Sequence, residues 1–352
     1  MERLIEISGR RIGPGYPTYL VAEISANHHQ KFNEAIELLR AAKDAGADAV
    51  KLQTYTADTL TIRSEQDYFR ISGGTPWDGG SLYDLYREAL TPWEWQPKLK
   101  AMADHLGMTL FSTAFDPSAV DFLEAMDVPV HKIASFEIVD IPLIEKMAST
   151  GKPLILSTGM ATLEEVEEAV RTARRSGATE LALLKCTSAY PALPDEMNLR
   201  TIPHLANTFG VPVGLSDHTL GIAVPVAAVA LGACIIEKHF TLSRDIPGPD
   251  SPFSLEPIEF KQMVEAIRTT EKALGKVHYG VSEHEVESRV FRKSLFVVKN
   301  VKAGDVFEEV NVRSIRPGHG LHPRYLRDIL GRRAVRDIER GTPLTWEHVS
   351  KE

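Results

Sequence analysis

Cysteine is scarce in this chain of 352 residues, which contains only Cys186 and Cys234. Each of the two lies inside an apolar run, so we expect both thiols to pack in a core and expect no disulfide framework. Such sparing use of cysteine is typical of proteins kept in a reducing compartment. The sequence therefore predicts a cytoplasmic protein.

Long apolar runs are also missing. The longest candidate, IAVPVAAVALGACII, is shorter than the roughly 18 to 20 residues that cross a bilayer, and Pro225 and Gly232 interrupt it. The first residues, MERLIEISGRRIG, carry charges every few positions and lack the apolar centre of a signal peptide. We expect no membrane partner from either segment.

An excess of basic residues is absent as well, because the formal net charge is −8. A general nucleic-acid binder needs a basic face to neutralise phosphates, so this class of protein is not expected. A small anion could still bind where a few lysines converge. The sequence also lacks G-x-S-x-G, CxxC pairs and a Walker loop, which removes the familiar nucleophile, thiol and nucleotide motifs.

What the chain does have is a regular alternation of short apolar runs and amphipathic segments. Residues 32–47 and 162–178 have helical spacing, and Thr162 with Glu165 predicts a capping box. Eight nearly continuous apolar runs predict the buried strands of a parallel sheet. They are TYLVAEIS, AVKLQTY, MTLFSTAF, VHKIAS, PLILSTG, LALLKCTS, VPVGLSDH and ACIIEKHF. This alternation favours an α/β fold of the (β/α)8 TIM-barrel type over a Rossmann fold, since no G-x-G-x-x-G follows a strand.

The chain is expected to divide into a barrel at residues 1–275, a linker at 276–293 and a small domain of β and turn character at 294–352. About sixty residues make a small core, so packing of the last domain against a partner is expected. Residues 63–92 are too many for a plain loop after a strand. This insertion is a candidate lid or substrate-contacting loop over the barrel mouth.

The active site of a TIM barrel forms at the carboxyl ends of its strands, so the polar residues that finish the eight runs predict one ring. Lys51 and Lys132 are the basis of a cradle for phosphate or carboxylate. Hydroxyl groups complete this cradle at Thr113, Ser135, Ser157 and Ser216. The alternative is structural pairing of the lysines with Glu23, Glu137 or Glu237. The remaining members of the ring include Ser112, Lys185, Asp217 and Lys238.

Two histidines, His218 and His239, end consecutive strand candidates. Two imidazoles with open positions beside them suit a divalent ion such as Mn²⁺, Fe²⁺, Co²⁺ or Zn²⁺, although each could instead be a structural histidine. His28 and His29 lie in a loop and could contact a substrate or be solvated. His131 should point away from Lys132, toward the core or a helix.

Eight motifs in order resemble the sialic acid synthase family, whose enzymes condense phosphoenolpyruvate with an N-acetylated amino sugar. They are AEISANH, VKLQTY, KIAS with Glu137, STGMA, KCTSAYP, GLSDHT, EKHFTL followed by GPDS, and RPGHGL, and they cover essentially the whole chain. The small domain resembles the antifreeze-like, or SAF, domain of that family. The resemblance implies a domain-swapped homodimer in which Arg316 reaches the sugar bound by the other subunit.

Within the family, several tracts are similar to the branch of pseudaminic acid synthases. They are AEISANH, KCTSAYP, GLHPRY and GGTPWDGGSLYDLYREALTPWEW. Ser188 stands where N-acetylneuraminate synthases more often have asparagine. This similarity implies 2,4-diacetamido-2,4,6-trideoxy-L-altrose as the sugar, in place of N-acetylmannosamine. The alternatives in the same family are N-acetylneuraminate, legionaminate and spore-coat polysaccharide synthases.

The resemblance also implies a mechanism. His218 and His239 would hold Mn²⁺, or Mg²⁺ or Co²⁺, which polarises the aldehyde of the open-chain sugar for attack by C3 of the enol. Water then adds at C2, helped by Glu23, and phosphate leaves by C–O cleavage. The residues implied to bind phosphoenolpyruvate are Lys51, Thr113, Lys132, Ser135, Ser157, Ser188 and Ser216. Those implied to contact the sugar are Gln53, Glu137, Tyr190, Asp250 and Arg316. Asp217 would support the site or simply cap its strand.

Two rival hypotheses belong to other classes. A metal-dependent aldolase would work with pyruvate, and its Schiff-base version would need a nucleophilic lysine. A non-catalytic sugar-binding protein would keep the fold and use the SAF-like domain for recognition.

Overall fold

The computed structural model describes residues 3–72, 74–75 and 77–351, and the chain divides into two compact units between Gly275 and Lys276. Each unit is described by itself. Over the described residues, no helix combines the length and the apolar character needed to cross a bilayer.

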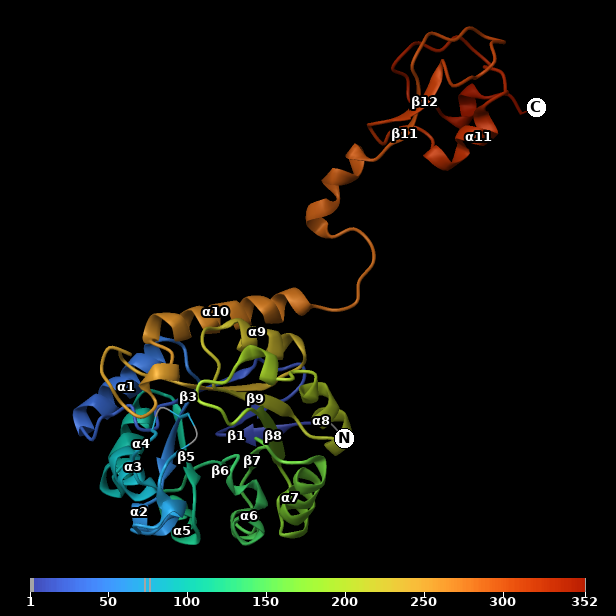
Figure 1. Ribbon diagram of the computed structural model, residues 1–352. Helices are drawn as coiled ribbons and strands as arrows, with labels where there is room; N and C mark the ends of the chain where they lie inside the picture. Colours follow the sequence, from blue (N-terminus) through green and yellow to red (C-terminus); the bar gives the residue numbers. More distant parts are fainter. Residues whose placement is uncertain (1–2, 73, 76, 352) are drawn as a thin grey trace. The chain divides into compact units, whose positions relative to one another are not determined.

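The first unit is a closed barrel of parallel strands, which confirms the predicted fold (Figure 1). The strands are β3 (Tyr19–Glu23), β4 (Ala49–Thr54), β5 (Thr109–Ala114), β6 (His131–Ile133), β7 (Leu154–Ser157), β8 (Leu181–Cys186), β9 (Val213–Asp217) and β10 (Ile235–His239). Each strand pairs with the next in the chain, and β10 pairs with β3 to close the barrel. All eight predicted apolar runs form barrel strands. They are apolar along their length because helices cover one face of each strand and the barrel interior covers the other.

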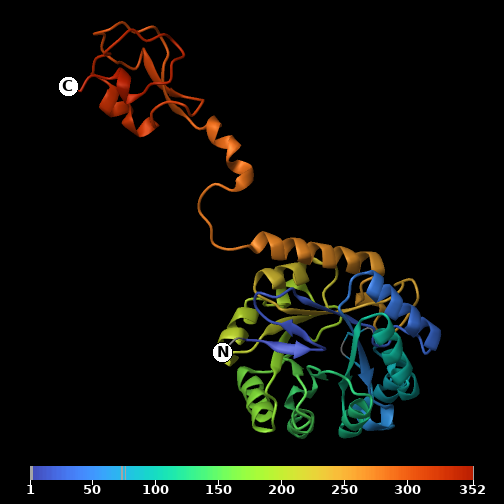
Figure 2. The same cartoon turned by 180° about the vertical axis from the view of Figure 1, so that it is seen from behind.

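Helices surround the barrel on its outer side. They are α1 (Phe32–Asp44), α4 (Gln96–His105), α5 (Pro117–Ala125), α6 (Ile141–Ala148), α7 (Leu163–Arg175), α8 (Thr201–Phe209), α9 (Ala223–Ala230) and α10 (Pro257–Leu274). The capping box predicted at the start of α7 is present, with Thr162 and Glu165 each satisfying a backbone N–H of the other. The long helix α10 packs against α9 and α1 (Figures 1 and 2).

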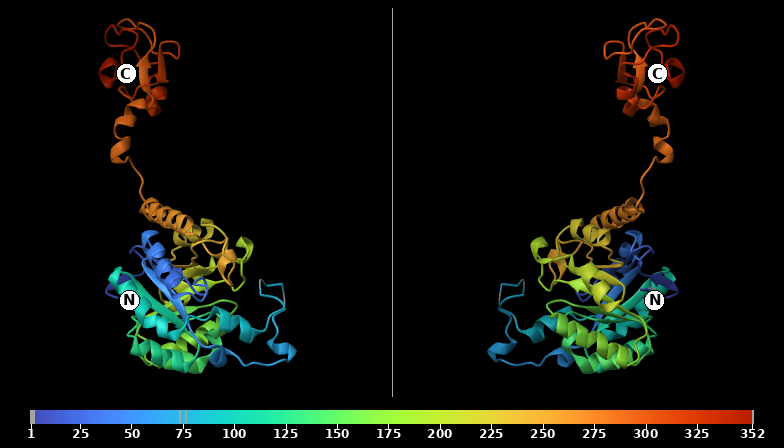
Figure 3. Two further views of the ribbon diagram at one scale, coloured as in Figure 1. Left: turned by 90° about the vertical axis from the view of Figure 1, so that its left-hand side faces the viewer. Right: turned by 90° about the vertical axis from the view of Figure 1, so that its right-hand side faces the viewer.

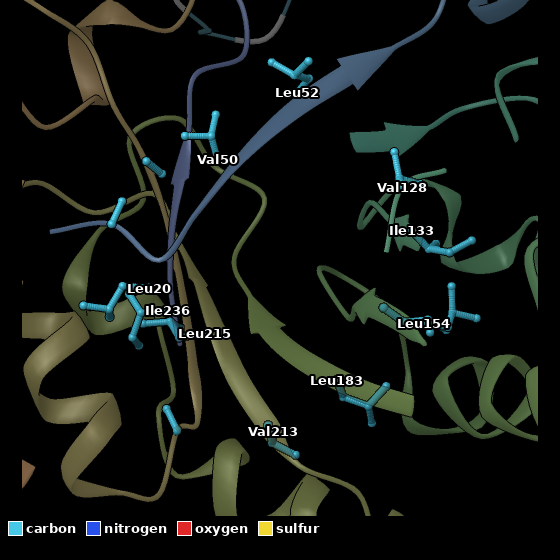
Figure 4. Close-up of a cluster of buried hydrophobic side chains, with 14 of the residues drawn as sticks. Leu20, Val50, Leu52, Val128, Ile133, Leu154, Leu183, Val213, Leu215 and Ile236 are labelled. Atoms are coloured by element: carbon cyan, nitrogen blue, oxygen red, sulfur yellow. The ribbon is translucent and has the colours of Figure 1, made fainter. Parts of the chain in front are cut away.

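Side chains alternate between the two faces of each strand and build two separate cores. Leu20, Leu215 and Ile236 belong to the larger core between the strands and the helices (Figure 4). The inward residues of the same strands form a second core together with the N-terminal hairpin of β1 (Ile5–Ile7) and β2 (Arg10–Ile12). The hairpin contributes Ile5, Ile7 and Ile12 to this inner core. The barrel interior is therefore packed with apolar side chains at the end that the hairpin covers. Polar side chains occupy the interior at the carboxyl ends of the strands.

The predicted insertion follows β4 and precedes β5. It contains or adjoins α2 (Ala57–Leu60), η1 (Asp67–Phe69), α3 (Leu82–Ala89) and η2 (Trp93–Trp95). Figure 3 shows it extending from the barrel on the side opposite the N-terminal hairpin, which is the side of the strand ends. Short 3₁₀ turns η3 (Glu137–Val139), η4 (Pro194–Glu196) and η5 (Ser251–Phe253) lie in other loops after strands.

The second unit begins with the turns η6 (Glu283–Glu285) and η7 (Glu287–Phe291) and continues into a small fold of its own. Its elements are β11 (Ser294–Val297), β12 (Val312–Ile315), η8 (Pro323–Tyr325), α11 (Leu326–Ile329) and η9 (Trp346–His348). The antiparallel pair β11 and β12 packs with Phe307, Ile329 and Leu344 in a separate apolar core. Strand pairs and turns dominate, as the sequence predicts for this segment.

Candidate active site

The alternation of the barrel strands sorts the polar residues at their ends into an inward set and an outward set. On β10, Ile235 belongs to the inner core and Ile236 to the outer one, so Glu237 and His239 point inward and Lys238 outward. The same count on β9 directs Ser216 and His218 inward and Asp217 outward. The ring predicted from the sequence was too broad, since Ser112, Lys185, Asp217 and Lys238 face the helix side of their strands.

Four charged groups meet inside the barrel at its upper end. Lys51 forms a buried ion pair with Glu23, and its Nζ lies 3.7 Å from Oε1 of Glu237. Lys132 Nζ lies 3.9 Å from the same Glu237 oxygen. With both carboxylates ionised the four charges cancel, which makes burial of the cluster tolerable. Each lysine therefore has a carboxylate partner, as the structural alternative expects, and the two lie close together inside the barrel through their shared neighbour Glu237.

Burial disfavours every charge in this cluster, and the neighbours decide the outcome. Burial raises the pKa of Glu23 to about 7, even with Lys51 beside it. It also acts to raise the pKa of Glu237, but Lys132 and Lys51 outweigh it and hold that pKa below its usual range. Burial acts to lower the pKa of Lys51, and the two carboxylates reverse this and raise it. Glu237 is thus the stable anion of the cluster, whereas Glu23 can exchange a proton near neutral pH.

Hydroxyl groups surround the two lysines, as predicted. Lys51 Nζ donates to Thr113 Oγ1 at 2.9 Å, and Lys132 Nζ donates to Ser157 Oγ at 2.8 Å. Ser216 Oγ donates to Glu237 at 3.0 Å. These short donors and fixed cations are the groups that phosphate and carboxylate oxygens require.

A second group of hydroxyls lies in the loops above the strands, where Ser135 and Ser188 are 2.7 Å apart. Gly159, with φ of +49°, makes this approach possible. A Cβ at that position would lie 2.4 Å from the Cβ of Ser135 and 2.9 Å from Oγ of Ser188. The glycine of the STGMA motif therefore keeps open a space that any other residue would fill.

The two histidines are neighbours, with ring centroids 5.3 Å apart. Nδ1 of His218 lies 2.8 Å from the carbonyl oxygen of Thr187, to which it must donate, so its Nε2 carries a lone pair. Burial, and then the nearby His218, Lys51 and Lys238, hold the pKa of His239 well below its usual range, so this ring is neutral. Among the described residues, Nδ1 of His239 has no hydrogen-bond partner.

Two neutral nitrogens on adjacent strand ends fit a divalent ion that takes its other ligands from water or substrate. Within the described part of the chain, no three His, Cys, Asp or Glu groups come together as a metal site. Burial acts to lower the pKa of His218, but the Cys186 thiol and the Thr187 carbonyl outweigh it and raise it. A metal would therefore compete with a proton at His218.

Directly behind the histidines, Asp217 and Lys238 form an ion pair between β9 and β10. These residues are register partners, their side chains are fully buried, and Nζ lies 2.5 Å from Oδ2. Asp217 Oδ1 also accepts hydrogen bonds from the backbone N–H and the hydroxyl of Thr219, at 3.0 and 2.9 Å. Lys238 donates in addition to the carbonyl of Thr219. The pair ties together the two strand ends from which His218 and His239 project, and Asp217 also caps the turn after β9.

Four of the five predicted sugar contacts, Gln53, Glu137, Tyr190 and Asp250, line one cavity of about 350 Å³ at the barrel mouth. The same cavity is lined by Ser135 and Ser188, which were predicted to bind phosphoenolpyruvate, and by the predicted metal ligand His239. Burial raises the pKa of Glu137 to about 7, and among the described groups its Oε2 has no hydrogen-bond partner. Tyr190 stacks beside His218, with ring centroids 4.4 Å apart, and Asp250 lies 3.6 Å from Nδ1 of His239.

Arg316 is the one predicted site residue outside the barrel. It is exposed and follows β12 in the second unit. Its contact with a sugar stays a prediction.

The other histidines considered from the sequence have partners outside the metal site. His131 is buried and bonds Glu124 of α5 at 2.8 Å, so it faces a helix as predicted. The solvated alternative for His28 and His29 was wrong. His28 is fully buried and bonds Thr91 at 3.1 Å, and His29 bonds Glu34 at 2.9 Å.

Glu237, expected only as a structural partner of the lysines, lies close to both of them. Two other contributors to this site, Ser25 and Trp77, were not singled out from the sequence. Ser25 joins Asp250 to Gln53 by accepting from Gln53 Nε2 at 3.0 Å and donating to Asp250. Trp77 of the insertion reaches the same mouth and donates to the carbonyl of Pro249 at 2.9 Å.

Comparison with known proteins agrees with this geometry. Residues 38–279 match the NeuB family, and residues 292–350 match the SAF domain. The chain is 45% identical to the pseudaminic acid synthase of Helicobacter pylori over 95% of this chain and 98% of that one. It is 38% identical to the N,N'-diacetyllegionaminic acid synthase of Legionella pneumophila, over 96% of both chains.

Among solved structures, the N-acetylneuraminic acid synthetase of Leptospira borgpetersenii, crystallised with citrate, superposes with a TM-score of 0.73 and 32% identity. The match covers 82% of this chain and 95% of that one. Sequence and fold therefore point to the same group of enzymes.

Proposed function

This chain belongs to the NeuB family, and on that premise we propose that it is a pseudaminic acid synthase. It condenses phosphoenolpyruvate with 2,4-diacetamido-2,4,6-trideoxy-L-altrose and water to give a nonulosonic acid and phosphate. The observation that carries the proposal is the buried pair of lysines, Lys51 and Lys132, beside two neutral-nitrogen donors on adjacent strand ends. The same end of the barrel thus carries the groups of an anion cradle and of a site for an electrophile.

Phosphoenolpyruvate binds through the two lysines and the hydroxyls around them. Its phosphate and carboxylate oxygens accept from Lys51 and Lys132 and from the donors Thr113, Ser135, Ser157, Ser188 and Ser216. The close contact of Ser135 with Ser188 supports this assignment, because both hydroxyls can turn toward a common acceptor.

His218 and His239 would hold the divalent ion, for which we propose Mn²⁺, with Mg²⁺ or Co²⁺ as substitutes. When bound there, such an ion withdraws electrons from a carbonyl oxygen and makes its carbon a better electrophile. Residues of the chain orient the sugar. Glu137 and Asp250 accept hydrogen bonds from hydroxyl or amide groups of the sugar, Gln53 donates, and Tyr190 covers one face.

C3 of the enol attacks the aldehyde carbon, and water then adds to C2. Glu23 removes the proton from that water, a task suited to a carboxylate with a pKa of about 7. The tetrahedral carbon then expels phosphate by cleavage of its C–O bond as its hydroxyl becomes the C2 ketone, and the two protons of the added water end on the former aldehyde oxygen and on phosphate. Lys51 forms an ion pair with Glu23 and faces the cradle, so its positive charge lies close both to the Glu23 carboxylate and to the bound phosphate.

We further propose that the enzyme is a domain-swapped homodimer of the cytoplasm. The SAF match and the exposed position of Arg316 support a role for the second unit in contacting the sugar of the other subunit. The free, buried thiols of Cys186 and Cys234 support a reducing location, where phosphoenolpyruvate is also made.

The test is a sugar panel with phosphate release as the readout, using phosphoenolpyruvate labelled with ¹⁸O in the bridging position. The altrose derivative should give the highest kcat/KM, ahead of N-acetylmannosamine and the legionaminate precursor, and the label should leave with phosphate. His218→Ala should abolish turnover, whereas His204→Ala, an exposed histidine on α8, should match wild type. Preference for another sugar would reassign the branch of the family. A borohydride-trapped adduct with pyruvate would instead establish the aldolase hypothesis.

A further inference from the structure

The cavity at the barrel mouth is lined by polar and by apolar side chains. The polar part of the lining includes the groups described above, among them Glu137 and Asp250. The apolar part contains side chains of the insertion and of nearby loops and strands. These side chains are Leu60, Ile71, Leu82, Leu85, Tyr86 and Phe115. None of them has a role in the chemistry proposed for the polar part.

Helix α3 provides most of this apolar surface. Leu82, Leu85, Tyr86 and Ala89 follow the spacing i, i+3, i+4 and i+7, which places them on one face. Such a stripe normally becomes buried against a protein core. In α3 no residue is buried, and all four side chains are half-buried along the cavity. The helix therefore presents its apolar face to the space that the sugar contacts share.

Aromatic contacts fix the insertion at this place. Trp77 lies against Tyr190, with ring centroids 5.6 Å apart, and its indole N–H donates to Pro249 next to Asp250. On the other side Tyr86 meets Tyr55 at 5.8 Å. Because Tyr190 is also 4.4 Å from His218, one ring separates the histidines from the insertion.

We propose that the apolar part of the cavity lining, with the face of α3 at its centre, is a subsite for the deoxygenated, N-acylated end of the amino sugar. It selects sugars with a methyl group at C6 and an acylamino group at C4 over sugars with hydroxyls there. This inference rests on the proposed function, which brings C1 of the open-chain sugar close to His239. Carbons 4 to 6 are farthest from C1, so they extend toward Leu82, Leu85 and Ile71.

The physical reason is desolvation. A methyl group against leucine and isoleucine leaves water favourably, whereas a hydroxyl placed there would lose its hydrogen bonds without replacement. The volume of about 350 Å³ is in the range of about 300 to 1,000 Å³ that small-molecule sites have. Apolar pockets of this kind discriminate by about 10- to 200-fold for each methylene group.

The experiment uses the full-length dimer and two substitutions on different segments, Leu85→Asn and Ile71→Asn. Leu274→Asn, at the exposed end of α10, is the matched control. Phosphate release is measured with the altrose derivative and with N-acetylmannosamine. For each cavity variant, kcat/KM for the altrose derivative should fall about 10-fold or more relative to that for N-acetylmannosamine. KM for phosphoenolpyruvate should stay at its wild-type value. Leu274→Asn should change neither the ratio of the two kcat/KM values nor this KM.

A binding measurement separates this inference from the proposed function. The two sugars are reduced to alditols, which cannot react, and titrated calorimetrically into wild type and both variants. Selective loss of affinity for the altritol derivative supports the subsite even if wild type releases no phosphate, a result that would sink the synthase assignment alone. Equal losses for the two alditols, or unchanged affinity in both variants, would overturn the subsite. Should Leu85→Asn fail to fold, Ile71→Asn decides the matter.

Discussion

Replacing Lys238 by methionine tests how the two histidines are held in place. The substitution keeps the length of the side chain but leaves Asp217 as a buried carboxylate without its cation. Breaking a buried ion pair costs about 3 to 5 kcal/mol. Asp217 keeps two hydrogen bonds from Thr219, so we expect the lower end, about 3 kcal/mol. At about 2 to 4 °C for each kcal/mol, the melting temperature should fall by about 6 to 12 °C.

The matched variants turn this number into a test of mechanism. Asp217→Asn combined with Lys238→Met removes both charges, and the double variant should recover about half or more of the loss. Lys272→Met, an exposed lysine of α10, should stay within about 0.5 kcal/mol of wild type. Circular dichroism during heating and in urea provides the assay. A loss below about 1 kcal/mol for Lys238→Met, or a double variant no better than the single one, would refute the reasoning.

The same variant should also weaken metal binding, because each partner of the ion pair directly precedes a histidine. We expect the Kd for Mn²⁺ to rise about 10- to 100-fold in Lys238→Met, as for other supporting partners of metal ligands. Calorimetric titration of Mn²⁺ measures this without turnover. Unchanged affinity would show that the ion pair stabilises the barrel without positioning His218 and His239.

Three other predictions concern the ligands. Burial raises the pKa of Glu137 to about 7, so its carboxylate should become an acceptor as pH rises through that value. KM for the sugar should fall over this range in wild type and stay flat in Glu137→Gln. Lys132→Met should raise KM for phosphoenolpyruvate about 30-fold or more while KM for the sugar stays nearly constant; equal changes would contradict the cradle. Arg316→Ala and Glu23→Gln should each be nearly inactive, but mixed subunits should regain about a quarter of wild-type activity if the domains are swapped. No regain would contradict the swap.

The barrel could be predicted from the sequence because its signal is local. Each strand is a continuous apolar run, and each run ends in polar residues where a TIM barrel has its active site. Alternation within the strands carries more information than a list of polar ends. Counting from Ile236 outward would have placed Lys238 among the helices and Glu237 beside the lysines.

What could not be predicted depends on partners far away in the chain. The burial of His28 depends on Thr91 and on the ring of Trp95, both more than sixty positions later. The contact of Trp77 with Pro249 joins segments 172 positions apart. No local pattern encodes such contacts, because they follow from how the insertion folds back over the barrel mouth.

The position of the insertion between β4 and β5 has an evolutionary consequence. None of the cradle residues lies between positions 63 and 92, and the strands that bear the cradle are complete without this segment. If the proposed subsite holds, part of the preference for a sugar lies in a segment that carries no residue of the cradle. Exchange of this segment with that of a related synthase should then shift the preference for a sugar while leaving KM for phosphoenolpyruvate unchanged.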